Sequence, residues 1–158
     1  MSRSGTLTGM VASHPSKLTT TGRWVAIAVM VLAASPLVTA YLLQPAAQGH
    51  GTHRQLGLPA CGWQVSMGLP CPTCGMTTSF AHVARGEFLA AATTQPAGML
   101  LCVVVAMTVV GSLWAALTGA PMQRVLVAAL RPSIVWTGVA VLLLGWAWTL
   151  LRAGGLTT

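Results

Sequence analysis

The sequence predicts an all-α integral membrane protein with three transmembrane helices, a cysteine-containing loop and short interfacial helices. Charged residues make up 6% of the 158 residues, whereas soluble domains carry roughly 25%. Mean hydropathy is +0.74. Three apolar runs each approach the length of about 20 residues that a helix needs to cross the hydrocarbon core. These observations predict the lipid bilayer as the main partner of the chain.

The first apolar run follows a tail that we expect to be disordered and basic over residues 1–23, because it is rich in Ser, Thr and Gly. We place the first transmembrane helix at residues 24–43, with a kink at Pro36, since proline lacks an N–H and clashes with the preceding turn. An alternative interpretation is a cleaved signal peptide with its apolar region at 24–34. The apolar character that continues to Leu43 argues against cleavage.

Two further runs complete the predicted membrane domain. The second helix is expected at residues 97–117, directly after Pro96, which suits a first helical turn. The third is expected at residues 134–151, with tryptophans near both ends as in an aromatic belt. Residues 118–133 between them hold a short apolar stretch and are predicted to form an interfacial connector. Residues 152–158 are predicted to be a tail.

The distribution of basic residues predicts the orientation in the membrane. Three spans put the termini on opposite sides. The N-terminal tail and the connector carry five basic residues: Arg3, Lys17, Arg23, Arg124 and Arg131. The 44–96 loop and the C-terminus carry three: Arg54, Arg85 and Arg152. The positive-inside rule therefore predicts a cytoplasmic N-terminus and an extracytoplasmic 44–96 loop.

The 44–96 loop is too long for a simple connection and concentrates the reactive side chains. Cys71 and Cys74 form a Cys-Pro-Thr-Cys-Gly motif, and Cys61 lies ten residues before Cys71. After Gly75 the pattern turns helical, with one apolar face (Phe80, Val83, Ala84, Phe88) and a polar face (Thr78, His82, Arg85). Gly86 is expected to break this helix, and Glu87 to begin another, so that two short helices occupy residues 75–94.

Three chemistries remain open for the cysteines. A C-x-x-C at a helix N-terminus is expected to have a lowered thiol pKa and to form a reversible disulfide, with Cys71 as nucleophile and Cys74 as its resolving partner. A soft metal such as zinc is expected to use Cys61, Cys71 and Cys74 with a histidine, His82 or the pair His50 and His53. A structural disulfide between Cys61 and either Cys71 or Cys74 would only cross-link the loop.

Other reactive combinations are missing from the sequence. Glu87 is the single acid, so no paired-carboxylate mechanism can be built, and no Ser/His/Asp set or glycine-rich phosphate loop is present. Cys102 lies inside the second apolar run and is expected to be inert. The eight basic residues form no block interleaved with aromatics, which excludes a typical nucleic-acid surface. An enzyme is therefore not the favoured interpretation.

At the motif the chain resembles the small bacterial membrane proteins grouped as domain-of-unknown-function family 2752. The resemblance covers about residues 57–117. It rests on a Cys-Pro-x-Cys-Gly-(Leu/Met)-Thr core at 71–77, an Arg-Gly-acid-apolar pattern at 85–88, and the polar-Pro pair Gln95-Pro96. Many members have Arg after the Thr, where this chain has Thr78. The resemblance implies a multi-pass protein of the bacterial inner membrane without an assigned activity.

We therefore expect a structural or accessory membrane protein in which the C-x-x-C motif organises the loop and a surface for a protein partner. The first alternative is a membrane thiol–disulfide oxidoreductase, against which stands the lack of a thioredoxin-like βαβ pattern. The second alternative is a metal-binding membrane protein. No other cofactor is expected.

Overall fold

The computed structural model describes residues 19–120 and 131–153, and in these ranges all regular structure is helical. Three long helices, α1 (Thr20–Leu42), α5 (Pro96–Thr118) and α7 (Pro132–Ala153), are long and apolar enough to cross a membrane. The predicted fold class is confirmed. The expected stretch 122–130 of the connector and most of both tails lie outside the described residues.

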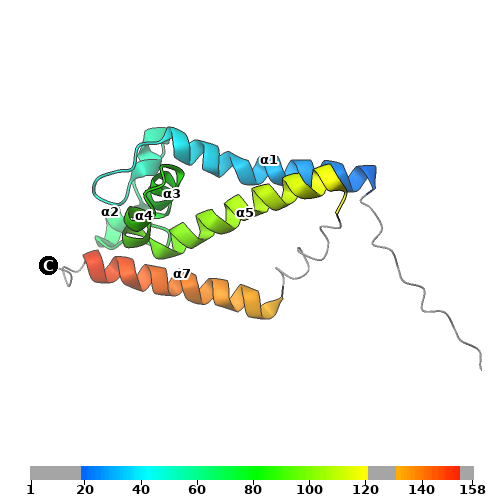
Figure 1. Ribbon diagram of the computed structural model, residues 1–158. Helices are drawn as coiled ribbons and strands as arrows, with labels where there is room; N and C mark the ends of the chain where they lie inside the picture. Colours follow the sequence, from blue (N-terminus) through cyan, green and yellow to red (C-terminus); the bar gives the residue numbers. More distant parts are fainter. Residues whose placement is uncertain (1–18, 121–130, 154–158) are drawn as a thin grey trace, which may run out of the picture.

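The short elements gather at one end of the long helices (Figure 1). They are the 3₁₀ helix η1 (Thr52–Leu56) and the helices α2 (Gly62–Met67), α3 (Met76–Ala84) and α4 (Phe88–Thr94). The C-terminal ends of α1 and α7 and the N-terminal end of α5 meet at this end. Residues that the chain separates by more than 70 positions are thereby brought together around the cysteine motif.

Helix α1 begins at Thr20, earlier than the expected start at residue 24. The reason is a cap: the Thr19 hydroxyl accepts a hydrogen bond from the Gly22 N–H at 3.2 Å. The helix continues past Pro36 to Leu42, and the Ser35 hydroxyl donates to the Leu32 carbonyl at 2.9 Å. This carbonyl is the one that a proline at position 36 cannot reach. A side chain thus replaces the missing backbone hydrogen bond.

The core is small and lies where α3 is wedged between α1 and α5. Ala40, Phe80 and Cys102 form its buried centre, with Leu37 and Val83 among the residues packed against it. Phe80 and Val83 thus take the inward positions expected for the apolar face. Phe88 does not join them: it begins α4 after the chain turns at Gly86 and is 56% exposed. Thr78, expected on a polar face, is fully buried.

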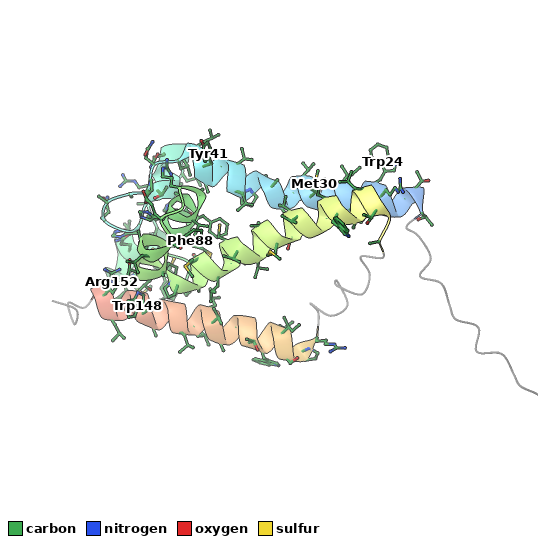
Figure 2. All side chains as sticks on the ribbon, in the orientation of Figure 1. Trp24, Met30, Tyr41, Phe88, Trp148 and Arg152 are labelled. Carbon is green, nitrogen blue, oxygen red and sulfur yellow. The ribbon has the colours of Figure 1, made fainter. Side chains whose placement is uncertain are left out.

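Large apolar side chains cover the outside of the three long helices (Figure 2). Leu32, Leu117 and Leu144 are each more than 70% exposed. A continuous apolar surface of this kind is unfavourable in water and favourable in lipid. Trp24 lies at one end of the bundle, and Tyr41 and Trp148 lie at the other, as in the aromatic belts of membrane helices. We conclude that the apolar helices associate with a lipid bilayer.

Candidate metal centre

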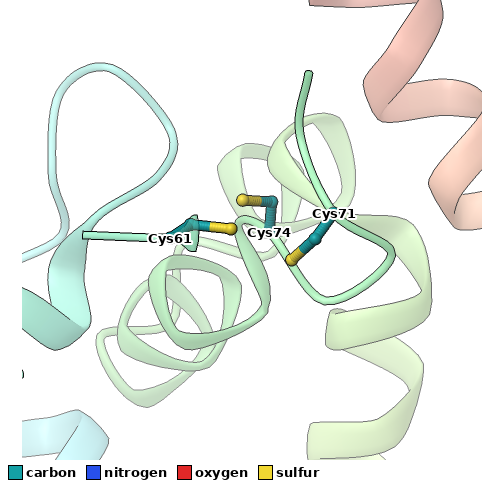
Figure 3. A group of neighbouring side chains, drawn as sticks. All are labelled: Cys61, Cys71 and Cys74. Atoms are coloured by element: carbon teal, nitrogen blue, oxygen red, sulfur yellow. The ribbon is translucent and has the colours of Figure 1, made fainter. Parts of the chain in front are cut away.

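Cys61, Cys71 and Cys74 form one cluster at the end of the bundle (Figure 3). Their Sγ atoms all lie within 4.8 Å of one another, and each is a free thiol. Cys71 and Cys74 come from the motif turn, and Cys61 comes from the start of α2. Three sulfurs at this separation can converge on a single ion with metal–sulfur bonds of about 2.3 Å.

The turn around the motif is fixed by its own backbone. The Cys74 N–H donates to the Cys71 carbonyl at 3.0 Å, and the Met76 N–H donates to the Thr73 carbonyl at 3.1 Å. Gly75 then has a φ of 85°, in the left-handed region. A Cβ there would meet the Gly49 carbonyl oxygen at 3.0 Å. Glycine is therefore required at this position for two reasons, conformation and space.

Two side chains from distant helices hold the turn from the outside. Gln95, fully buried before α5, donates its Nε2 to the Pro72 carbonyl at 3.2 Å. Trp146 of α7 donates its Nε1–H to the Pro70 carbonyl at 3.0 Å. Its ring packs edge-on against that of Trp63, with 6.1 Å between the ring centroids. These hydrogen bonds satisfy carbonyls that flank Cys71 and position its side chain.

Neither supporting residue was assigned a role from the sequence. A signal was available for Gln95, because a polar residue at the start of a membrane helix is costly unless it is paired. Trp146 showed only a tryptophan near a helix end, which indicates a membrane interface equally well. Their shared target, the motif turn, becomes visible only when α5 and α7 are placed beside it.

Burial raises the pKa of the Cys74 thiol to about 12. The backbone N–H of Gln64 lowers the pKa of the Cys61 thiol to about 7, assisted by its neighbour Cys71. The expectation of a lowered pKa in the C-x-x-C pair is therefore wrong for Cys74. The reason is local: α3 begins only at Met76 and Cys74 is buried, whereas Cys61 is the N-cap residue of α2.

The histidines considered as ligands lie apart from this group of sulfurs. His82 Nδ1 donates to Glu87 Oε2 at 2.6 Å, an interaction that bridges α3 and α4. His50 Nε2 accepts from Gln64 Nε2 at 2.7 Å. His53 Nε2 donates to the Pro59 carbonyl at 3.2 Å. Within residues 19–120 and 131–153, the three cysteines are the group of His, Cys, Asp and Glu residues close enough to hold one ion.

The segment that carries the three cysteines matches a known protein family. Residues 61–109 match the family described as protein of unknown function (DUF2752). This DUF2752 segment contains Cys61, Cys71 and Cys74, the helices α3 and α4, and the first half of α5. The resemblance expected from the motif is confirmed over about a third of the chain. No curated protein and no solved structure matches the chain.

Proposed function

We propose that this membrane protein binds a soft divalent metal ion, such as Zn²⁺, through Cys61, Cys71 and Cys74. The supporting observation is that three sulfur atoms lie within 4.8 Å of one another. They come from two segments, the start of α2 and the motif turn. A disulfide would use two of these sulfurs and leave the third adjacent. A metal ion uses all three, and thiolates are the ligands that soft ions prefer.

The charges in the cluster also favour a cation. Two thiolates within 4.8 Å of each other repel by at least about 3.5 kcal/mol at an effective dielectric constant of about 20. Burial already keeps Cys74 protonated near neutral pH. A divalent ion offsets this repulsion and displaces the proton, as it does in thiolate metal sites generally.

For orientation we propose a cytoplasmic N-terminus and an extracytoplasmic metal site in a bacterial inner membrane. The support is the excess of basic residues in the N-terminal tail and the 118–133 connector, five against three. A reporter fused at each terminus tests this orientation, since the two ends are predicted to lie on opposite sides.

Thiol–disulfide exchange is a second candidate function. It is supported by the position of Cys61, a partly exposed cysteine beside the buried Cys74. Oxidation of that pair would form one S–S bond and release two electrons and two protons to an external disulfide, which would be reduced to two thiols. For this second candidate we propose Cys61 as the nucleophile in place of Cys71, because the pKa of Cys61 is lowered to about 7.

The deciding experiment measures metal content and thiol state of the detergent-purified protein together. We expect about one Zn²⁺ per chain after dialysis against Zn²⁺, alkylation of three cysteines only after chelation, and no change on adding a reductant. Cys71→Ser is expected to abolish stoichiometric binding. Cys102→Ala is the matched control, because Cys102 is buried in α5 outside the cluster.

The other results would each assign a different role. Alkylation that requires a reductant, with a mass lower by two hydrogen atoms, would contradict metal binding and support disulfide chemistry. Free alkylation under every condition would contradict both, and would leave the cysteines with the structural role that organises the loop.

A further inference from the structure

A cavity of about 590 Å³ lies directly beside the cysteine cluster. We call it the α1 chamber. Helix α1 lines it with Ser35 and Thr39, and Cys61, Cys71 and Cys74 line it as well. The volume is within the range of about 300–1,000 Å³ that is typical of small-ligand sites. All three proposed metal ligands therefore border the same cavity.

The polar groups of the α1 chamber offer lone pairs and no permanent positive charge. The hydroxyls of Ser35 and Thr39 already donate to backbone carbonyls of α1, each at 2.9 Å, which leaves their oxygens as acceptors. His53 donates through Nε2, so its Nδ1 is an acceptor as well. Among the described residues that line the chamber there is no Lys, Arg, Asp or Glu.

A second cavity, of about 490 Å³, also borders Cys74 and differs from the α1 chamber in charge. Arg152 lines it, and the Arg152 guanidinium donates to the Thr93 carbonyl there. Gln64 lines both cavities and is hydrogen-bonded to His50. A fixed positive charge opposes the passage of a metal cation, so the α1 chamber is the favourable approach to the sulfurs.

The three-sulfur group supplies one ligand fewer than closed structural zinc sites use. Such sites hold the ion with four protein ligands, whereas sites with three protein ligands keep one position for an external molecule. A divalent ion with three thiolates has a net charge of −1. A fourth thiolate would make the net charge −2, and no cationic side chain among the described lining residues of the chamber would offset it. A neutral fourth ligand is therefore favoured.

We propose that the cluster is an open exchange site, in which the fourth coordination position faces the α1 chamber and takes a neutral nitrogen or oxygen donor. The ion enters and leaves through the same chamber by ligand substitution, without oxidation or reduction. This inference rests on the proposed metal binding and adds the direction of access and the class of the fourth ligand.

The chamber lies along the last third of α1. Ser35 lies seven residues before the end of α1 at Leu42, which corresponds to about 10 Å along the helix axis. Because α1 is long and apolar enough to span a membrane, the chamber extends from the end of this helix toward the middle of the span. Thr39 lines the chamber from α1 and is partly buried, so a larger side chain at this position is expected to occupy part of the chamber.

The test uses the full-length protein in detergent micelles loaded with Co²⁺, whose visible spectrum reports thiolate ligation and coordination number. Imidazole is the neutral probe and azide the anionic one. We expect imidazole to change the spectrum saturably and azide to have little effect at the same concentration. Thr39→Phe is expected to abolish the imidazole response and to slow exchange of Co²⁺ for Zn²⁺ by about tenfold or more, equivalent to about 1.4 kcal/mol in the barrier.

Matched variants separate obstruction from misfolding. Val38→Phe adds the same ring one residue away, at a side chain that is 57% exposed and does not line the chamber, and is expected to leave both measurements unchanged. Ser35→Leu is a smaller obstruction for use if Thr39→Phe does not fold. His53→Ala removes the one histidine among the described residues that line the chamber.

Each outcome is decisive. Absence of Co²⁺ binding by the unmodified protein would overturn the proposed function itself. Binding without a spectral response to imidazole, together with a spectrum altered by His53→Ala, would show a closed site with four protein ligands and overturn only the exchange proposal. Equal exchange rates in Thr39→Phe, Ser35→Leu and Val38→Phe would overturn the route through the α1 chamber.

Discussion

Helix α7 packs closely against the start of α5 at Gly145, and this close contact allows a quantitative prediction. Gly145 is buried, and a Cβ added there would lie 2.6 Å from Ala97 Cβ and 3.0 Å from Gln95 Oε1. Carbon atoms pack at about 3.5–4.0 Å, so Gly145→Ala requires α7 to withdraw by about 1 Å. Small residues at such crossings are typical of membrane helix pairs.

Withdrawal of α7 would break the contacts next to Gly145. Trp146 Nε1 donates to the Pro70 carbonyl at 3.0 Å, and Trp148 Nε1 donates to the Thr93 carbonyl at 2.9 Å. A displacement of about 1 Å takes both beyond hydrogen-bond distance. Overpacking of this kind destabilises by about 1–3 kcal/mol, including relaxation of the surroundings.

Gly138→Ala is the matched control on the same helix, because a Cβ at Gly138 meets no atom within 4 Å. Alanine is about 1 kcal/mol more favourable than glycine in a helix. Both variants gain this propensity, so they should differ by the overpacking cost alone, about 1–3 kcal/mol in the free energy of unfolding.

Reversible unfolding in mixed micelles of dodecylmaltoside and sodium dodecyl sulfate, followed by tryptophan fluorescence, measures this difference. The relevant tryptophans, Trp146 and Trp148, lie one and three residues after the substituted position. A difference below about 0.5 kcal/mol, the usual range of surface substitutions, would show that α7 does not pack at Gly145 and would refute the reasoning.

Three further predictions concern the motif and the residues next to it. Gly75→Ala, at a φ of 85°, is expected to destabilise the fold by about 1–2 kcal/mol and to weaken metal binding. Gly62→Ala is the control, because a Cβ there meets no atom within 4 Å, and it should leave stability and metal binding unchanged. Calorimetry with Zn²⁺ compares the two variants. In the metal-free protein, alkylation of Cys61 by iodoacetamide should rise through about pH 7, since its pKa lies near that value; a midpoint near pH 9 would contradict the stabilisation of the thiolate by the α2 backbone. Trp146→Phe, which leaves the Pro70 carbonyl without its donor, should cost about 1 kcal/mol in unfolding experiments, and an unchanged stability would argue against this hydrogen bond.

The Cys61 prediction also sets the pH dependence of folding. The pKa of Cys61 is lower in the folded protein than the ordinary value of 9.0. Its contribution to stability is therefore fully present above about pH 9 and is lost as the pH falls through about 7. Cys61→Ser should flatten the stability profile in this window, which unfolding measured at a series of pH values would detect.

Much of the architecture follows from the sequence because it depends on composition and local pattern. Runs of about 20 apolar residues predict membrane helices wherever their partners lie. The break at Gly86 and the short helices on either side of it are likewise local, because a helix cannot continue through that turn. Helix boundaries were less predictable: the Thr19 cap extends α1 by a full turn.

The cysteine site divides in the same way. Spacing alone indicated that Cys71 and Cys74 act together, because two intervening residues form one turn. That Cys61 joins them, that burial keeps Cys74 protonated, and that His82 pairs with Glu87 instead are decided by the packing of α2, α3 and α4. The support from Gln95 and Trp146 depends on α5 and α7, which the chain reaches 20 to 75 residues later. Local pattern determined the elements and the motif; burial and long-range contacts, which no short stretch encodes, decided which side chains meet there.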